Sequence, residues 1–302
     1  MSEIAFGKED MSASSIDFWA ELPSPLKRTV KNAFFAWAEK HYRSKKIIFS
    51  SYFPSTMGGD MPKEDYLVNM SLESAPKNYL AMGFGESSSE DFYNKYIKSG
   101  FYSHEKIVAW FCETMVVDTK RLGNRPLPSS YADLAEPCYR GEVCIIGSQE
   151  IPDPLLALFV QKERGKAQAS RLIDNIAGFG APVNAIRHIG KPSNTFGSVF
   201  VMPLLFAEVC REIQSARVIR PEEGFFAEPF ILFSQDDDEK PSLIKDFFLS
   251  DEFKSALAEK YFLVSNAEND KLIFPACAEP YFPEVEEIYS ILKKKLDKKK
   301  LA

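Results

Sequence analysis

The sequence lacks any long hydrophobic run. No window approaches the roughly 20 apolar residues that a helix needs to cross a bilayer, so no membrane span is predicted. The first fifteen residues, MSEIAFGKEDMSASS, are polar and lack the apolar stretch of a secretory signal. As written, the sequence predicts a cytoplasmic protein. If a leader has been removed, the expected location is instead periplasmic or extracellular.

Metal-binding and catalytic motifs are also missing. The five cysteines form no C-x-x-C pair, and the three histidines lie far apart with no H-E-x-x-H. Neither G-x-x-x-x-G-K-[ST] nor G-x-S-x-G occurs, which removes common phosphate-loop and hydrolase motifs. We therefore predict no metal site, no cofactor and no disulfide framework.

Excess positive charge is absent as well. The 37 basic and 43 acidic side chains give a net charge of −6, so nucleic acid is not an expected partner. The lysines at 293–295 and 298–300 form a basic run at the C-terminal end. This run is interpreted as a solvated end, with a surface-binding tail as the alternative.

The chain has 302 residues, 45% of them apolar, enough to bury a substantial core in one large or two ordinary domains. Strand-like and helix-like segments alternate along it, which predicts an α/β fold with mainly parallel sheets. Strands are expected at 46–50, 79–83, 107–118, 142–146, 216–219 and 228–234. Helices are expected at 26–41, 154–163, 166–176, 199–213, 250–261 and 285–296.

Four segments resemble the type 2 periplasmic solute-binding proteins of ABC transporters, in the subgroup that includes ferric-iron and thiamine binders. Residues 128–134 (PSSYADL), followed by 139–143 (YRGEV), resemble that family's P-x-[ST]-W-x-D-L passage, with Tyr131 in the tryptophan position. Residues 116–119 (VVDT) stand where the family has a strand that ends in Tyr-Asn. Residues 220–224 (RPEEG) resemble its return crossing, and residues 246–252 (DFFLSDE) resemble the helix that follows.

The resemblance implies a two-lobed fold in which each lobe is a mainly parallel sheet flanked by helices and the ligand cleft lies between the lobes. It implies that residues 1–116 and 222–275 form lobe 1, with an extra N-terminal helix, and that residues 117–221 form lobe 2. The C-terminal helix at 276–302 is expected to pack near the hinge or on lobe 2. The implied function is non-enzymatic binding of a small-molecule or ion ligand, with an ABC permease as partner, or the role of a cytosolic relative.

Candidate ligand-binding residues are polar or aromatic groups near strand ends, where open α/β sheets place their ligands. Glu113 is included because a carboxylate inside an apolar strand needs a partner, which is either a hinge arginine or a cationic ligand. The segment at 194–196 is included because it precedes an expected helix start, whose N–H groups could face the cleft. The full set is Ser50, Ser51, Gly85, Glu86, Glu113, Ser148, Asn194, Thr195, Phe196 and Glu223.

Three alternatives stay open at this stage. Ferric iron is disfavoured because the sequence has no adjacent tyrosine pair, which the ferric binders use as ligands. An enzyme on the same scaffold could use Cys112 with Glu113, or His188, although nothing in the sequence places a nucleophile beside a base. A cytosolic sensor or scaffold protein could use the helix at 26–41 to dock a partner, unless that helix packs on the first lobe.

Overall fold

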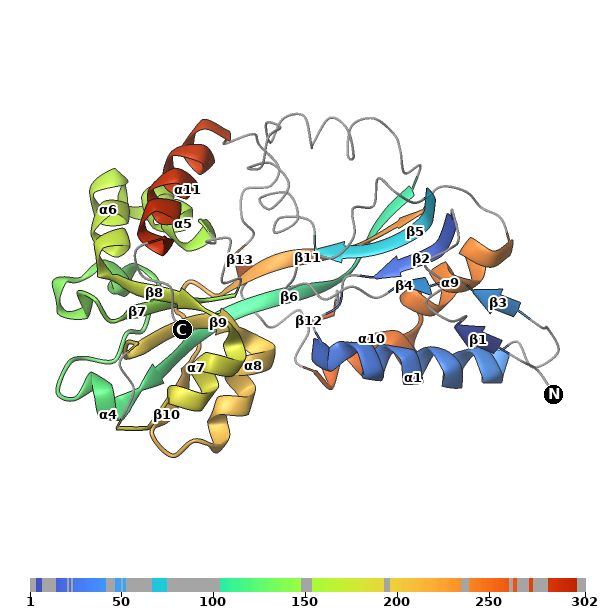
Figure 1. The fold of residues 1–302 in the computed structure, drawn as a ribbon, viewed down its shortest axis with the longest axis horizontal. Coiled ribbons are helices and arrows are strands. Elements are labelled where there is room, and N and C mark those ends of the chain that lie inside the picture. The colour runs from blue at the N-terminus through green and yellow to red at the C-terminus, as the bar shows by residue number, and fades with distance from the viewer. Residues whose placement is uncertain are drawn as a thin grey trace. The chain divides into compact units, whose positions relative to one another are not determined.

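The chain divides into two compact units, each built from two stretches of sequence. Unit 1 comprises Met1–Phe111 and Pro229–Ala267, and unit 2 comprises Cys112–Glu228 and Glu268–Ala302. The chain passes between the units three times: inside strand β6 (His104–Asp118), inside strand β11 (Phe225–Ser234), and again after Ala267. A computed structural model describes residues 4–6, 15–20, 22, 24–41, 47–49, 51–52, 67–74, 104–147, 154–192, 196–234, 239–260, 263–264, 272–273 and 282–297 (Figure 1).

Unit 1 contains parallel strand pairs and a helical layer. Strand β2 (Ser15–Ala20) pairs in parallel with β4 (Ser51–Tyr52) and with β5 (Leu67–Ser74), and β5 pairs antiparallel with β11. A separate parallel pair joins β1 (Ile4–Phe6) to β3 (Ile47–Phe49), and β12 (Leu263–Val264) pairs antiparallel with β6. The helices that the structure describes in this unit are α1 (Ser24–His41), α9 (Glu239–Leu249) and α10 (Asp251–Ala258).

The predicted N-terminal helix is confirmed as α1, and it belongs to the core of unit 1. Val30, Phe34 and Trp37 recur at steps of three and four residues and are all buried, as expected for one face of a helix. The Phe34 ring meets Phe247 of α9 edge to face, with 5.1 Å between ring centroids. Since this apolar face is covered within its own unit, it is not available to dock a partner.

Among the described residues, unit 2 contains a sheet segment with helices on both faces. Strand β7 (Val143–Ile146) pairs in parallel with β8 (Ile176–Gly180) and β9 (Val199–Pro203). Strand β9 pairs antiparallel with β6, whose other edge pairs antiparallel with β10 (Ala216–Ile219). The helices and short turns are α4 (Thr119–Leu122), η3 (Ala132–Ala135), η4 (Pro137–Tyr139), α5 (Leu155–Arg164), α6 (Lys166–Asn175), α7 (Pro182–His188), α8 (Leu204–Val209), η5 (Cys210–Glu212) and α11 (Phe282–Leu296). Strand β13 (Leu272–Ile273) pairs in parallel with the start of β11.

Alternation along the strands divides unit 2 into two cores. Side chains at 143, 145, 199 and 201 enter one buried cluster with residues of α5, α6 and α11. Their neighbours at 144, 146, 200 and 202 enter a second cluster with residues of α7 and α8. Figure 1 shows these two groups of helices on opposite faces of β7–β9. Because every residue of β7 and β9 is buried, these strands are apolar throughout.

The prediction of a helix over 199–213 is wrong for its first five residues. Residues 199–203 form strand β9, and helix begins only at Leu204. The run Val199-Phe200-Val201-Met202 is continuously apolar. Such a run fits a strand that is buried on both faces of a sheet as well as it fits a buried helix. Pairing with β6 on one edge and β7 on the other selects the strand.

Candidate functional site

Glu113 lies at the edge of the unit 2 sheet where the parallel strands end. Strands β7, β8 and β9 run in the same direction, so their carboxyl ends, at Ile146, Gly180 and Pro203, share one edge. The antiparallel strand β6 brings Glu113 there, directly opposite Pro203. Open α/β sheets bind ligands outside this edge, which supports Glu113 as the best-placed candidate among the described residues.

Glu113 is buried, and Tyr131 holds its main chain. The Glu113 residue is 5% exposed, and its main-chain carbonyl accepts a hydrogen bond of 2.7 Å from the Tyr131 hydroxyl. Burial, reinforced by the nearby charge of Glu113, raises the pKa of Tyr131 well above its usual value. The tyrosine therefore stays a neutral hydrogen-bond donor. Tyr131 belongs to the segment 128–134 that resembles the family, but it is not among the residues predicted to bind the ligand.

Glu223 lies just before β11, and both of its carboxylate oxygens have partners. They accept hydrogen bonds from the backbone N–H groups of Tyr131, at 3.1 Å, and Ala132, at 3.2 Å. A carboxylate at the start of a helical turn satisfies N–H groups that have no partner within the turn. The structure thus joins two of the segments on which the resemblance rested, 128–134 and 220–224. A ligand contact by Glu223 stays a prediction.

Phe196 lies at the opposite edge of the sheet, three residues before the start of β9. Its ring meets His188 edge to face, with 4.4 Å between centroids, and it packs against the cluster formed with α7 and α8. Because the segment that follows Phe196 is a strand, the argument from a helix start no longer supports residues 194–196. Their contact with the ligand stays a prediction.

The other candidates are Ser51 and six residues outside the described part of the chain. Ser51 lies in β4 opposite Phe18 of β2, in unit 1, and its side chain is outside the described part of the chain. Six further candidates lie outside the described residues altogether: Ser50, Gly85, Glu86, Ser148, Asn194 and Thr195.

Cys112, considered with Glu113 for an enzyme, and His188, considered as the alternative, are far apart. The Gly190 N–H donates to the Asp118 carboxylate at 2.8 Å, so the end of α7 lies beside the last residue of β6. Cys112 is six residues back along that strand, about 20 Å away at roughly 3.3 Å per residue. The structure therefore does not bring these two side chains together.

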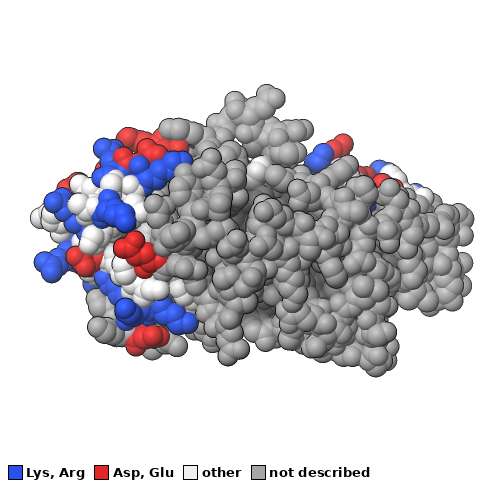
Figure 2. Space-filling model, turned by 90° about the horizontal axis from the view of Figure 1, so that it is seen from above, with Lys and Arg blue, Asp and Glu red and all other residues white. Residues whose placement is uncertain are grey.

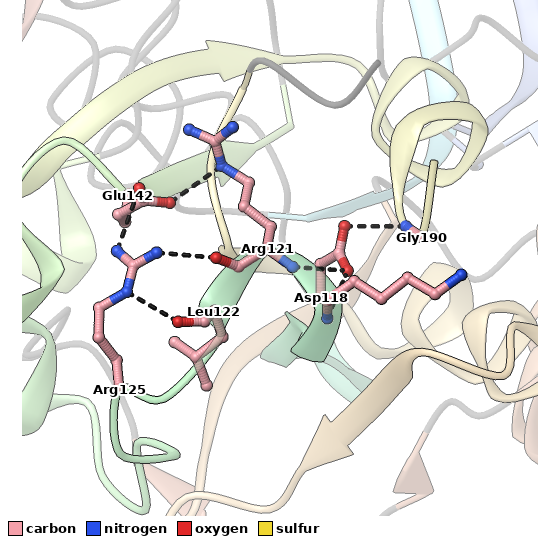
Figure 3. Close-up of polar contacts among 7 residues, drawn as sticks. Asp118, Arg121, Leu122, Arg125, Glu142 and Gly190 are labelled. Atoms are coloured by element: carbon pink, nitrogen blue, oxygen red, sulfur yellow. Dashed lines mark hydrogen bonds and ion pairs between the residues drawn. The ribbon is translucent and has the colours of Figure 1, made fainter. Parts of the chain in front are cut away.

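A polar cluster that the sequence did not reveal occupies the amino edge of the parallel strands (Figure 3). Asp118, 1% exposed, accepts hydrogen bonds from the backbone N–H groups of Lys120, Arg121 and Gly190. These contacts cap the start of α4 and hold the turn after α7, where Gly190 has a positive φ of 79°.

Glu142 completes this cluster by binding two arginines. Its carboxylate oxygens lie 3.0 Å from Arg121 Nε and 3.0 Å from Arg125 Nη1. Arg125 also donates to the carbonyl oxygens of Arg121 and Leu122, at 2.8 and 2.9 Å, at the end of α4. Since these groups bind one another and the backbone, and lie at the edge away from the strands' carboxyl ends, the cluster has a structural role.

Charge on the described surface is mixed. Figure 2 shows lysine, arginine and acidic side chains interspersed among the described residues at the left of the view. Within the described residues, no three His, Cys, Asp or Glu side chains come together in a way that could hold a metal ion. No helix there is long and apolar enough to cross a membrane.

Two α/β units connected by strands that run from one unit into the other form a two-lobed fold. Solved structures share this fold at low sequence identity. The iron-bound HitA from Pseudomonas aeruginosa has a TM-score of 0.59 at 12% identity, over 94% of this chain and 99% of that one. The periplasmic binding protein AfuA from Actinobacillus pleuropneumoniae, with fructose-6-phosphate bound, has a TM-score of 0.59 at 16% identity, over 95% and 99%. The Bordetella ferric binding protein has a TM-score of 0.56 at 12% identity, over 94% and 98%.

The chain belongs to the bacterial extracellular solute-binding protein family, whose model matches residues 76–288. Among proteins of curated function, none matches this chain in sequence. Ligand binding, the function predicted from the sequence, is thereby confirmed, as are the fold class and the resemblance to type 2 solute-binding proteins. Proteins of this family are normally not enzymes.

Proposed function

We propose that this protein is the substrate-binding component of an ABC-type uptake system, acting outside the cytoplasm, and that it binds one small polar solute without changing it chemically. The observation that supports this most directly is the pair of shared strands, β6 and β11. Each begins in one unit and ends in the other, so bending these strands lets the units close on a ligand.

We propose the ligand contacts from the same chemistry. Glu113 offers a buried carboxylate at the carboxyl edge of the parallel strands, which would select a cationic or hydrogen-donating group on the solute. The remaining candidates offer hydroxyl, amide, carboxylate or ring groups or, for glycine, the main chain alone: Ser50, Ser51, Gly85, Glu86, Ser148, Asn194, Thr195, Phe196 and Glu223. Iron-binding and sugar-phosphate-binding proteins both share the fold, so both ligand classes belong in the test.

Native mass spectrometry of freshly purified protein, compared with the denatured mass and with metal analysis, is the first experiment. A discrete excess of mass identifies a co-purified metal or organic solute. A thermal-shift series then covers ferric citrate, fructose 6-phosphate, thiamine and citrate. At 100 times the dissociation constant, a ligand adds about 2.7 kcal/mol of stability. For a chain of this size, this corresponds to about 5 °C in Tm.

Two variants make this experiment specific. Glu113→Gln keeps the shape of the side chain but removes its charge, and we expect it to weaken binding of the solute found. Glu287→Gln removes an exposed carboxylate in α11 and is the matched control. No excess mass and no thermal shift would contradict the proposal. Turnover of a bound solute that is lost in Cys112→Ser or His188→Gln would favour an enzyme instead.

A further inference from the structure

Tyr131 contacts two strands, β6 and β11, inside which the chain passes from one unit to the other. Its hydroxyl donates to the Glu113 carbonyl oxygen in β6 at 2.7 Å. Its ring packs against the Phe226 ring in β11, with 4.2 Å between centroids and 32° between ring planes. The side chain is fully buried. One rigid aromatic residue thus joins two strands that are more than a hundred positions apart in the sequence.

Residues 222–223, just before β11, are joined to residues 129–132 by three further hydrogen bonds. The Glu223 carboxylate accepts from the N–H groups of Tyr131 and Ala132, at 3.1 and 3.2 Å. The Glu222 N–H donates to the Ser129 carbonyl oxygen at 2.9 Å. Charge-assisted bonds to backbone N–H groups are stronger than neutral ones, so this attachment is firm.

The residues that Tyr131 contacts in β6 and β11 lie close to the limits of unit 2. Unit 2 begins at Cys112, one residue before Glu113, and its first stretch ends at Glu228, two residues after Phe226. The residues that Tyr131 contacts in β6 and β11 thus lie within two positions of the limits of unit 2.

We propose that Tyr131 and Glu223 form a hinge anchor, which fixes the unit 2 ends of β6 and β11 and confines the bending of these two strands to residues 108–112 and 227–231. Breaking the anchor would let the motion spread into unit 2. The inference rests on the proposed closure of the two units. The test uses ligand-free protein. The hinge anchor can therefore be refuted while solute binding is confirmed, and solute binding can be refuted while the hinge anchor is confirmed.

The chain offers a matched pair of substitutions, Tyr131→Phe and Tyr139→Phe. Both tyrosines are buried and come from the same segment, and both hydroxyls donate to a main-chain carbonyl. The acceptor for Tyr139 is Pro126, at 2.8 Å, which lies in neither shared strand. The two variants thus remove the same kind of bond, and only one of them touches the hinge.

Hydrogen–deuterium exchange on the full-length, ligand-free chain is the measurement. Losing one hydrogen bond raises the local opening constant about two- to tenfold. We expect that increase in peptides spanning 113–118 and 222–228 for Tyr131→Phe. For Tyr139→Phe we expect it only in peptides around 125–142. Unchanged exchange of the shared strands in Tyr131→Phe, or an equal increase there in Tyr139→Phe, would overturn the proposal.

A second variant and a distance measurement keep the test decisive if Tyr131→Phe folds poorly. Glu223→Gln removes the charge and one acceptor oxygen with little change in volume. Spin labels at Ala36→Cys in α1 and Ser170→Cys in α6 report the distance between units, with Cys138 and Cys277 replaced by serine. We expect a wider distance distribution for Glu223→Gln than for the parent. An unchanged distribution would count against an anchor.

Discussion

Gly197 is a position where a single added methyl group should destabilise unit 2. A Cβ there would lie less than 3.0 Å from the Glu142 carbonyl oxygen, 2.9 Å from its carbonyl carbon and 2.8 Å from Cys144 Sγ. The backbone at Glu142 cannot move away easily, because its carbonyl accepts hydrogen bonds of 3.0 Å from the N–H groups of both Ser198 and Val199. Overpacking costs about 1–3 kcal/mol, and we expect the upper end, about 3 kcal/mol, for Gly197→Ala.

Urea unfolding followed by far-UV circular dichroism measures this cost. At about 2 kcal/mol per M of urea, the transition of unit 2 should move down by about 1.5 M. All three tryptophans, at positions 19, 37 and 110, belong to unit 1, so their fluorescence reports the other unit. Gly147→Ala is the control, since a Cβ there meets nothing within 4 Å. Equal stabilities for the two variants would refute the reasoning.

Three further predictions concern individual polar groups. Glu142→Gln should cost about 1–3 kcal/mol in urea unfolding because it leaves two arginines without their carboxylate, whereas Glu287→Gln, in an exposed pair, should change stability by less than about 0.5 kcal/mol. For Asp133, desolvation raises the pKa, but hydrogen bonds from residues 129 and 130 outweigh it and lower the pKa. The stability difference between wild type and Asp133→Asn should therefore be constant above about pH 5 and shrink below about pH 4; a difference that grows on acidification would contradict this. Ser250→Ala removes the hydroxyl that accepts the Phe253 N–H at the start of α10, and should destabilise unit 1 by about 1 kcal/mol in tryptophan-monitored unfolding, an effect that a threonine at the same position should largely restore.

Elements with a strong local pattern could be predicted from the sequence. The apolar positions of residues 26–41 repeat at helical spacing and form α1. The motif S-x-x-D at 130–133 predicts a helical start, and the structure has the reciprocal bonds, in which the Asp133 N–H donates to Ser130 Oγ and the Asp133 carboxylate accepts the Ser130 N–H. The four segments that resemble the solute-binding proteins, together with their order along the chain, were sufficient to predict the family.

Contacts between residues that are far apart in the chain could not be predicted from the sequence. Strand β9 resembled a helix because its apolar run has no period, and only its pairing with β6 and β7 decides the structure. Glu223 was chosen as a ligand residue from its place near a crossing, yet its carboxylate binds backbone N–H groups about 90 residues earlier. Asp118 reaches Gly190 across 72 residues, and no local pattern marks either partner.

The sequence by itself therefore determined the local elements, the α/β class and the family of this protein, because short-range hydrogen bonding and the spacing of apolar residues act over a few positions. Only the tertiary structure decided which charged groups are structural and where Tyr131 lies. Those outcomes depend on which strands become neighbours, and that is settled by burying both faces of the sheet at once.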